Sequence, residues 1–340
     1  MRILITGAAG FIGFHLSKRI LEKGHTVIGF DNLNNYYEPT LKKARLEQLE
    51  IYSKQNQSDF IFIKGNLQDK LDIENIFKTQ KPERVVNLAA QAGVRYSIDN
   101  PFTYIESNLV GFANILESCR HGDIEHLVYA SSSSVYGGNT NMPFKETQSV
   151  DHPISLYAAT KKSNELMAHS YSHLYNLPMT GVRFFTVYGP WGRPDMALFL
   201  FTKAILNNEP IKVFNKGHMT RDFTFIDDII ESLQRILDKP PTPSSDFNTN
   251  NPNPSISWAP HKIFNIGNST PTPLIEYINA IEDELGTKAK KLLLPMQQGD
   301  VAATESDASL LQEWINFKPN TPIKEGVKKF IKWYKEFYGI

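Results

Sequence analysis

Tyr157 and Lys161 stand four residues apart in a long helical pattern that follows Pro153. Residues at this spacing share one face of a helix, so the phenol and the ammonium are expected to lie side by side. A tyrosine normally keeps its proton until about pH 10, but a neighbouring positive charge favours the phenolate. The pair therefore predicts a general base, although the spacing is frequent on solvated helices and gains weight only from its surroundings.

Four consecutive serines, Ser131 to Ser134, run into Val135-Tyr136-Gly137. A polyserine run by itself usually forms a solvated loop. Here it directly follows the apolar run from His126 to Ala130, which has the character of a strand. The serines are thus expected at the carboxyl end of a strand, the edge at which open α/β sheets bind ligands.

Three glycines, Gly7, Gly10 and Gly13, follow the first apolar run and surround Phe11 and Ile12 at the start of a helical pattern. Glycines at this position let the backbone approach a pyrophosphate at the positive end of the helix. A glycine triplet alone also fits an ordinary tight turn between strand and helix. The strand and helix on either side favour a dinucleotide site.

Asp31 ends the second apolar run, 18 residues after Gly13. A carboxylate there accepts hydrogen bonds from an adenosine ribose and repels a 2′-phosphate, which favours NAD over NADP. The simpler alternative is a turn residue. A bound nicotinamide ring would also add positive charge near Tyr157 and favour its phenolate.

Strand-like runs alternate with helical stretches through the first half of the chain, which predicts a parallel sheet with helices on both faces. This is the α/β, Rossmann-type doubly wound architecture. The predicted strands are 2–6, 26–30, 60–64, 84–88, 126–130 and 179–184.

Beyond residue 184 the rhythm becomes irregular, with a helix expected at 196–206, strands at 211–214 and 223–225, and a helix at 227–237. We predict an NAD-binding domain over 1–184, to which 224–240 returns, and a smaller α/β substrate lobe over 185–340. Residues 240–260 are rich in Pro, Asn and Ser and predict a flexible surface loop. The final helix carries apolar residues on one face, as for core packing.

The composition excludes several classes of protein. Lys plus Arg and Asp plus Glu both number 36, so no bulk charge attracts nucleic acid or an anionic membrane. No apolar stretch reaches 18 residues, and the N-terminus lacks a signal-peptide pattern. The one cysteine, Cys119, has no disulfide partner within the chain. We expect a cytoplasmic protein that binds neither nucleic acid nor a membrane.

Together, the glycines, Asp31, Ser132, Tyr157 and Lys161 resemble the extended short-chain dehydrogenase/reductase family of nucleotide-sugar enzymes. The segment 221–228 is similar to the one by which that family re-enters its cofactor domain. The resemblance implies NAD as cofactor, Tyr157, Lys161 and Ser132 as catalytic residues, and a homodimer formed through the helices around 101–119 and 155–175. The further cofactor residues that it implies are Asn32, Asn66, Leu67, Leu88, Ala89, Ala90, Gln91 and Asn108.

Within that family the serine run separates the reactions. The 4,6-dehydratases carry Asp-Glu at the positions that match Ser133 and Ser134, and the decarboxylases that form UDP-xylose carry Glu at the second. Hydroxyls can hold a carboxylate but do not readily exchange protons. The run therefore looks epimerase-like.

Two segments, 92–97 and 183–196, closely resemble the UDP-glucuronate 4-epimerases. Epimerases for neutral galactose-type sugars carry asparagine where this chain has Thr186. The resemblance implies a reversible conversion of UDP-glucuronate into UDP-galacturonate through a 4-keto intermediate. The substrate residues that it implies are Arg95, Ser132, Ser133, Ser134, Tyr157, Thr186, Arg193, Arg221 and Asp300.

Other interpretations stay open at this point. The same residues would suit a 4-epimerase of UDP-glucose or UDP-N-acetylglucosamine, which needs no carboxylate partner, or a regulatory NAD-binding module without turnover. His169 and His173, four apart on the Tyr157 helix, suggest a metal only weakly, because no third ligand accompanies them. We predict no metal.

Overall fold

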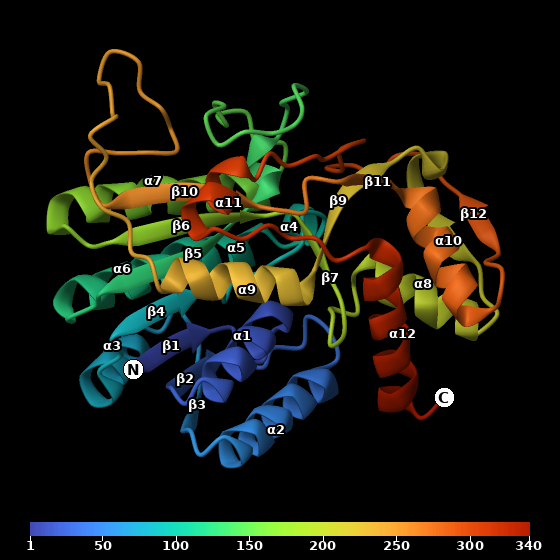
Figure 1. The fold of residues 1–340 in the computed structure, drawn as a ribbon, viewed down its shortest axis with the longest axis horizontal. Coiled ribbons are helices and arrows are strands. Elements are labelled where there is room, and N and C mark those ends of the chain that lie inside the picture. Colours follow the sequence, from blue (N-terminus) through green and yellow to red (C-terminus); the bar gives the residue numbers. More distant parts are fainter.

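The computed structural model describes residues 1–340 and is built around one seven-stranded sheet (Figure 1). Its strand order is β10-β6-β5-β4-β1-β2-β3, and all neighbouring strands are parallel. From β1 the order runs outward through β2 and β3 on one side and through β4, β5 and β6 on the other. This order confirms the Rossmann-type doubly wound fold. The strands are β1 (Arg2–Thr6), β2 (Thr26–Asp31), β3 (Phe60–Lys64), β4 (Arg84–Asn87), β5 (His126–Ser132), β6 (Met179–Phe184) and β10 (His261–Ile266).

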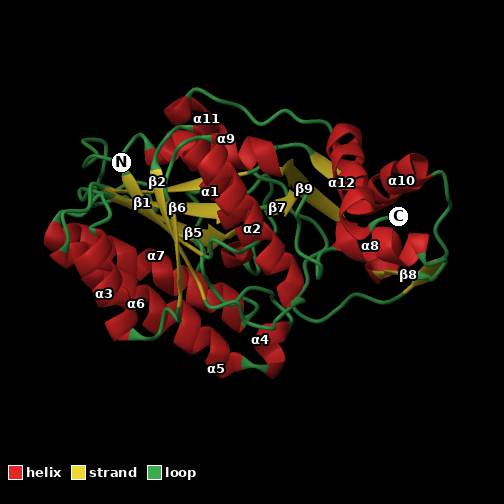
Figure 2. Ribbon diagram, turned by 90° about the horizontal axis from the view of Figure 1, so that it is seen from below, coloured by secondary structure: helices red, strands yellow, loops and turns green.

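Helices cover both faces of this sheet (Figure 2). One face carries α1 (Phe11–Glu22), α2 (Pro39–Gln55), α9 (Ile226–Leu237) and α11 (Ser309–Ile315), and the other carries α3 (Lys70–Gln80), α6 (Gly111–His121) and α7 (Leu156–Tyr175). Two separate clusters of buried apolar side chains fill the two interfaces. Strands buried on both faces read as continuous apolar runs, which is why their sequence signal is clear.

The smaller lobe contains two short sheets, β11-β9-β7 and β12-β8. Their strands are β7 (Thr186–Tyr188), β8 (Ile211–Val213), β9 (Thr220–Phe225), β11 (Pro271–Pro273) and β12 (Lys291–Leu293). Its helices are α8 (Ala197–Leu206), α10 (Leu274–Leu285) and α12 (Ile323–Tyr338). Short helical segments elsewhere are α4 (Tyr96–Asp99), α5 (Pro101–Tyr104), the π-helix Ile105–Val110 and the 3₁₀ turns Ser133–Tyr136 and Phe214–Gly217.

The chain returns to the large sheet twice. Helix α9 packs on it, and β10 pairs with β6 at its edge. A strand at 261–266 was not predicted, because His261, Lys262 and Asn265 interrupt its apolar residues. Residues 240–260 contain no helix or strand. The predicted smaller lobe over 185–340 is therefore interrupted by elements of the larger one.

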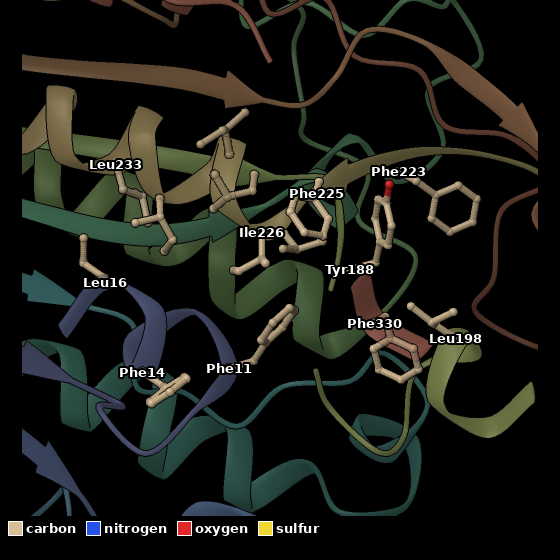
Figure 3. Close-up of a cluster of buried hydrophobic side chains, with 14 of the residues drawn as sticks. Phe11, Phe14, Leu16, Tyr188, Leu198, Phe223, Phe225, Ile226, Leu233 and Phe330 are labelled. Atoms are coloured by element: carbon tan, nitrogen blue, oxygen red, sulfur yellow. The ribbon is translucent and has the colours of Figure 1, made fainter. Parts of the chain in front are cut away.

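A continuous apolar core links the two lobes (Figure 3). Phe11, the first residue of α1, points toward Phe330 of α12 and lies below Ile226 of α9, while Tyr188 and Phe223 extend the cluster into the small sheets. Because these side chains are almost fully buried, the core fixes the smaller lobe against the glycine loop. No helix in the chain combines the length and the apolar character needed to cross a membrane.

Candidate active site

A pocket of about 620 Å³ lies at the carboxyl ends of the large sheet's strands, between the two lobes. It is lined by every catalytic and substrate residue that the sequence predicts, from β4, β5, α7, β7, β9 and β12 and the loops that follow them. These are Arg95, Ser132, Ser133, Ser134, Tyr157, Lys161, Thr186, Arg193, Arg221 and Asp300. This edge is the usual ligand site of an open α/β sheet.

The glycine loop makes a close backbone turn at one end of the pocket. A Cβ atom at Gly13 would lie 2.1 Å from the Gly7 carbonyl oxygen, so only glycine fits there. Helix α1 begins with no side-chain cap at Gly10 and no acidic residue in its first turn. Its unpaired N–H groups and positive dipole end therefore suit a pyrophosphate.

Asp31 lies beside this loop at the end of β2 and is almost fully buried. Its Oδ2 accepts a hydrogen bond from the Ala9 N–H (3.2 Å), and its Oδ1 accepts one from the Leu33 N–H (2.8 Å). Asp31 thus shapes the turn, the simpler role considered above, and also lines the pocket where a ribose hydroxyl could donate a hydrogen bond to it.

Helix α7 places Tyr157 and Lys161 in the pocket wall. Its N-cap is Ser155, whose hydroxyl accepts a hydrogen bond from the Ala158 N–H (3.1 Å) and so fixes where the helix begins. Lys161 Nζ donates to the Ala130 carbonyl of β5 (2.9 Å), and burial lowers the pKa of Lys161 to about 8. These contacts tie the helix to the strand that carries the serines.

Opposing effects act on the pKa of the Tyr157 phenol. Burial raises its pKa above the ordinary value, while a hydrogen bond with the Ser132 hydroxyl and the positive charge of Arg193 lower it. The positive charge of Arg193 thus favours the phenolate of Tyr157. The structure brings Ser132, Tyr157 and Lys161 together as the sequence predicted.

The four serines point in different directions. The Ser131 hydroxyl is buried and donates to Glu165 Oε1 of α7 (2.6 Å). Ser132 caps the following 3₁₀ turn by accepting a hydrogen bond from the Ser134 N–H (3.1 Å). Ser133 and Ser134 lie in that turn and line the pocket. Ser131 also belongs to the pocket lining, but its hydroxyl is already bound to Glu165.

Beneath the serines lies a buried ion pair that the sequence analysis missed. Arg183 donates to Glu165 through Nε (2.8 Å) and Nη2 (2.9 Å), with both side chains inaccessible to solvent. Arg183 Nη1 also donates to the Tyr136 hydroxyl, which donates to Asn265 of β10. Neither charge has a local sequence signature, because the partners come from α7 and β6 and meet only in the folded chain.

The opposite wall of the pocket belongs mostly to the smaller lobe, and Arg95 reaches it from the segment that follows β4. Arg95 Nη2 pairs with Asp300 Oδ2 at 3.5 Å, and Arg221 donates to the carbonyls of Thr220 and Val301. Thr186 is the first residue of β7 and is half-buried in the pocket lining. The wall thus combines two arginines with a hydroxyl, groups that bind phosphate and carboxylate oxygens.

Some predicted cofactor residues line the pocket and others do not. Asn66 and Asn108 lie outside the lining. Asn108 is buried and holds the backbone of Gln91 and the hydroxyl of Thr160, while Asn66 accepts a hydrogen bond from Asn32. Those that line it are Gly7, Gly10, Phe11, Ile12, Gly13, Asp31, Asn32, Leu67, Leu88, Ala89, Ala90 and Gln91.

His169 and His173 each form a hydrogen bond with a residue of the segment 240–260. His169 Nε2 bonds the Ser257 hydroxyl (2.7 Å), and His173 Nδ1 accepts a hydrogen bond from the Trp258 indole (3.0 Å). The two imidazoles therefore serve to seat this segment against α7.

Comparison with known proteins agrees with this geometry. The profile of the NAD dependent epimerase/dehydratase family matches residues 3–250. The chain belongs to that family. It is similar to Protein CapI of Staphylococcus aureus, with 56% identity over 338 residues and 99% of each chain covered. It is also similar to the probable UDP-glucuronate 4-epimerase of Rhizobium meliloti (strain 1021), with 46% identity over 339 residues, 99% of this chain and 98% of that protein.

A solved structure shows the same fold. The UDP-glucuronic acid 4-epimerase from Bacillus cereus, crystallised in complex with UDP-glucuronic acid and NAD, superposes with a TM-score of 0.86 at 30% identity and covers 99% of this chain and 100% of that one. As a member of the NAD dependent epimerase/dehydratase family, the chain uses NAD. The glycine turn, the uncapped α1 N-terminus and Asp31 fit the pyrophosphate and ribose of that cofactor.

Proposed function

We propose that this chain is a UDP-glucuronate 4-epimerase, which interconverts UDP-glucuronate and UDP-galacturonate. The observation that carries the proposal is a tyrosine base joined to Ser132, beside a serine run that contains no carboxylic acid. Elimination of water would need an acid and a base at that run, and none is present. The Rhizobium meliloti relative and the Bacillus cereus structure are both named as 4-epimerases of UDP-glucuronate, which supports this choice of substrate.

The proposed chemistry divides between cofactor and protein. NAD, which the glycine turn and Asp31 would hold, would supply a hydride acceptor for C4 of the sugar and a hydride donor for the return to the opposite face. Tyr157 removes the C4 hydroxyl proton and later gives it back, and Ser132 orients that hydroxyl. Lys161, fixed to the end of β5, holds the ribose side of the site and raises the acidity of the phenol.

The substrate carboxylate is proposed to lie against hydroxyls rather than against an acid. Ser133, Ser134 and Thr186 line the same pocket and can each donate one hydrogen bond. The 4-keto sugar is a β-keto acid and loses carbon dioxide easily, so a cradle that fixes its carboxylate also protects the intermediate. Arg193 and Arg221 are proposed to bind anionic oxygens of the UDP-sugar. Arg95 and Asp300 are proposed to bind its uridine.

The direct test is to incubate the purified protein, without added cofactor, with UDP-glucuronate and separately with UDP-glucose. Proton NMR of the products identifies the sugar formed. We expect UDP-galacturonate from the first and little change in the second. Conversion of UDP-glucose alone would contradict the substrate, and a xylose-type product would contradict the reaction.

We further propose a homodimer formed through α5, the following π-helix and α7. Large apolar side chains are exposed on these helices, with Phe102 78%, Leu166 60% and Leu174 62% accessible. Leu166 and Leu174 are eight residues apart and so share one face of α7. Sedimentation equilibrium tests this: Leu166→Glu is expected to shift a dimer toward monomer, and a monomeric native protein would contradict it.

A cytoplasmic location is also proposed. It rests on the single cysteine, Cys119, which is buried and has no partner for a disulfide. Fractionation of producing cells tests it, since recovery of the protein outside the cytoplasm would contradict it.

A further inference from the structure

Tyr36, Asp195 and Arg193 form a cluster where the two lobes meet at the pocket wall. Tyr36 lies in the loop after β2, and the other two lie in the turn that enters α8. The Tyr36 hydroxyl donates to Asp195 Oδ2 (3.1 Å), and Arg193 donates to both carboxylate oxygens, through Nε (3.0 Å) and Nη2. The contact joins residues 159 positions apart in the sequence.

Tyr36 is fixed from its own lobe. The buried Lys42 of α2 donates to the carbonyl and the side chain of Asn34, and the Asn34 side chain accepts a hydrogen bond from the Tyr36 N–H. On its other side, a Cβ atom at Gly93, where φ is +98°, would lie 2.6 Å from the Tyr36 hydroxyl oxygen. The phenol therefore has a defined position.

The segment that carries Arg193 is fixed as well. Arg45 of α2 is fully buried and donates to the Ala9 carbonyl of the glycine loop (2.8 Å) and to the Trp191 carbonyl (2.6 Å). The turn then closes with a hydrogen bond from the Met196 N–H to the Arg193 carbonyl (3.1 Å). Both sides of the cluster are thus anchored to the cofactor lobe.

The cluster leaves one donor of Arg193 unused. Nε and Nη2 are held by Asp195, and the guanidinium lies over the Tyr36 ring at 5.9 Å, while Nη1 has no partner within the chain. A guanidinium fixed along one edge presents its remaining N–H groups in a set direction. Asp195 remains ionised because Arg193 and the Tyr36 hydroxyl lower its pKa by more than burial raises it.

We propose that Tyr36 and Asp195 are positioning residues that orient Arg193 so that its free Nη1 donates to an anionic oxygen of the bound UDP-sugar. The inference rests on the proposed function, because it takes that ligand to be a UDP-sugar. The anionic oxygen belongs either to the sugar carboxylate or to the diphosphate, and both sources share this chemistry. The Tyr36 hydroxyl acts through Asp195, the Tyr36 ring lies beside the Arg193 guanidinium, and neither touches the substrate.

The test is a double-mutant cycle of Tyr36→Phe and Asp195→Ala in the protein as purified, with affinities for UDP-glucuronate, UDP-glucose and UDP measured by titration calorimetry. We expect Asp195→Ala to weaken UDP-glucuronate binding about tenfold and Tyr36→Phe about threefold, since charged hydrogen bonds are involved. The double variant should bind UDP-glucuronate as weakly as Asp195→Ala does.

Tyr52→Phe, on α2 outside the pocket, is the matched control and should change nothing. If only the affinity for UDP-glucuronate falls, Nη1 donates to the sugar carboxylate. If the affinities for all three ligands fall equally, Nη1 donates to the diphosphate. Additive effects of the two substitutions, or unchanged affinities in properly folded variants, would overturn the inference. Native protein that binds UDP-glucuronate without epimerising it would instead contradict only the proposed function.

Discussion

The Ser131 hydroxyl donates a 2.6 Å hydrogen bond to Glu165, the carboxylate that also binds Arg183 in a buried bidentate pair. Glu165 follows Tyr157 by eight residues and Lys161 by four on α7, so this contact lies directly behind the proposed base. The bond and the Lys161 contact to Ala130 together fix α7 against the end of β5. The first serine thus supports the site from within, while the next three face it.

Removal of Glu165 is expected to destabilise the whole protein. Arg183 would remain buried without a counter-charge, which costs about 3–5 kcal/mol in free energy of unfolding. Urea denaturation of Glu165→Ala measures this loss. Ser131→Ala is the milder companion and should cost about 1 kcal/mol, because it removes one hydrogen bond. A Glu165→Ala protein as stable as the native one would show that the pair does not stabilise the fold.

Tyr157→Phe removes the proposed base while keeping the ring. We expect kcat to fall by about 10²- to 10⁴-fold, with binding of UDP-glucuronate little changed. Tyr171→Phe is the matched control, since Tyr171 lies on the same helix but bonds Glu117 away from the pocket. Its kcat should stay native. An equal fall in kcat in both variants would mean that loss of a tyrosine hydroxyl disturbs α7 and that Tyr157 has no special role in the chemistry.

Thr186→Val tests the carboxylate cradle, because valine keeps the shape and removes the hydroxyl. The expected result is a rise of about fivefold in KM for UDP-glucuronate, from one lost hydrogen bond, with more carbon dioxide released per turnover. UDP-glucose binding should stay unchanged. Radiolabelled carboxyl carbon gives the leakage directly, and a variant with native KM and native leakage would exclude Thr186 from the cradle.

The stability of the protein should fall below pH 6.5. Burial lowers the pKa of His126 to about 4 and those of His15 and His261 to about 3. The unfolded chain therefore takes up three protons that the folded chain does not bind, and each costs about 1.4 kcal/mol per pH unit below 6.5. Burial raises the pKa of Glu146 to about 7, so the folded chain binds one proton more between pH 4.5 and 7, which offsets one histidine.

Denaturation at a series of pH values checks this dependence. His126→Gln should lower the slope of unfolding free energy between pH 6.5 and 5 by about 1.4 kcal/mol per unit, whatever its effect at pH 7. His121→Gln, at a side chain 68% exposed, should leave the slope unchanged. Identical slopes for His126→Gln and the native protein would show that His126 titrates normally when folded.

Much of the fold follows from local patterns. Three predicted strands, at 2–6, 60–64 and 179–184, match the structure at both ends, since apolar runs bounded by polar residues mark buried parallel strands. The β5 strand extends two residues further than predicted, into Ser131 and Ser132, because pairing with Arg183 and Phe184 continues there. Strand β10 was not predicted, since its pairing with β6 depends on tertiary context.

Local sequence patterns identify the glycine turn, Asp31, the hydroxyl run and the Tyr157–Lys161 pair, because each depends on residues close together in the chain. The folded arrangement is needed to see that the Ser131 hydroxyl binds Glu165 and that Arg193 acts on Tyr157. Tyr36 and Asp195 meet across 159 positions, so no local spacing could reveal them. Their contact exists because a shared core holds the two lobes in one arrangement.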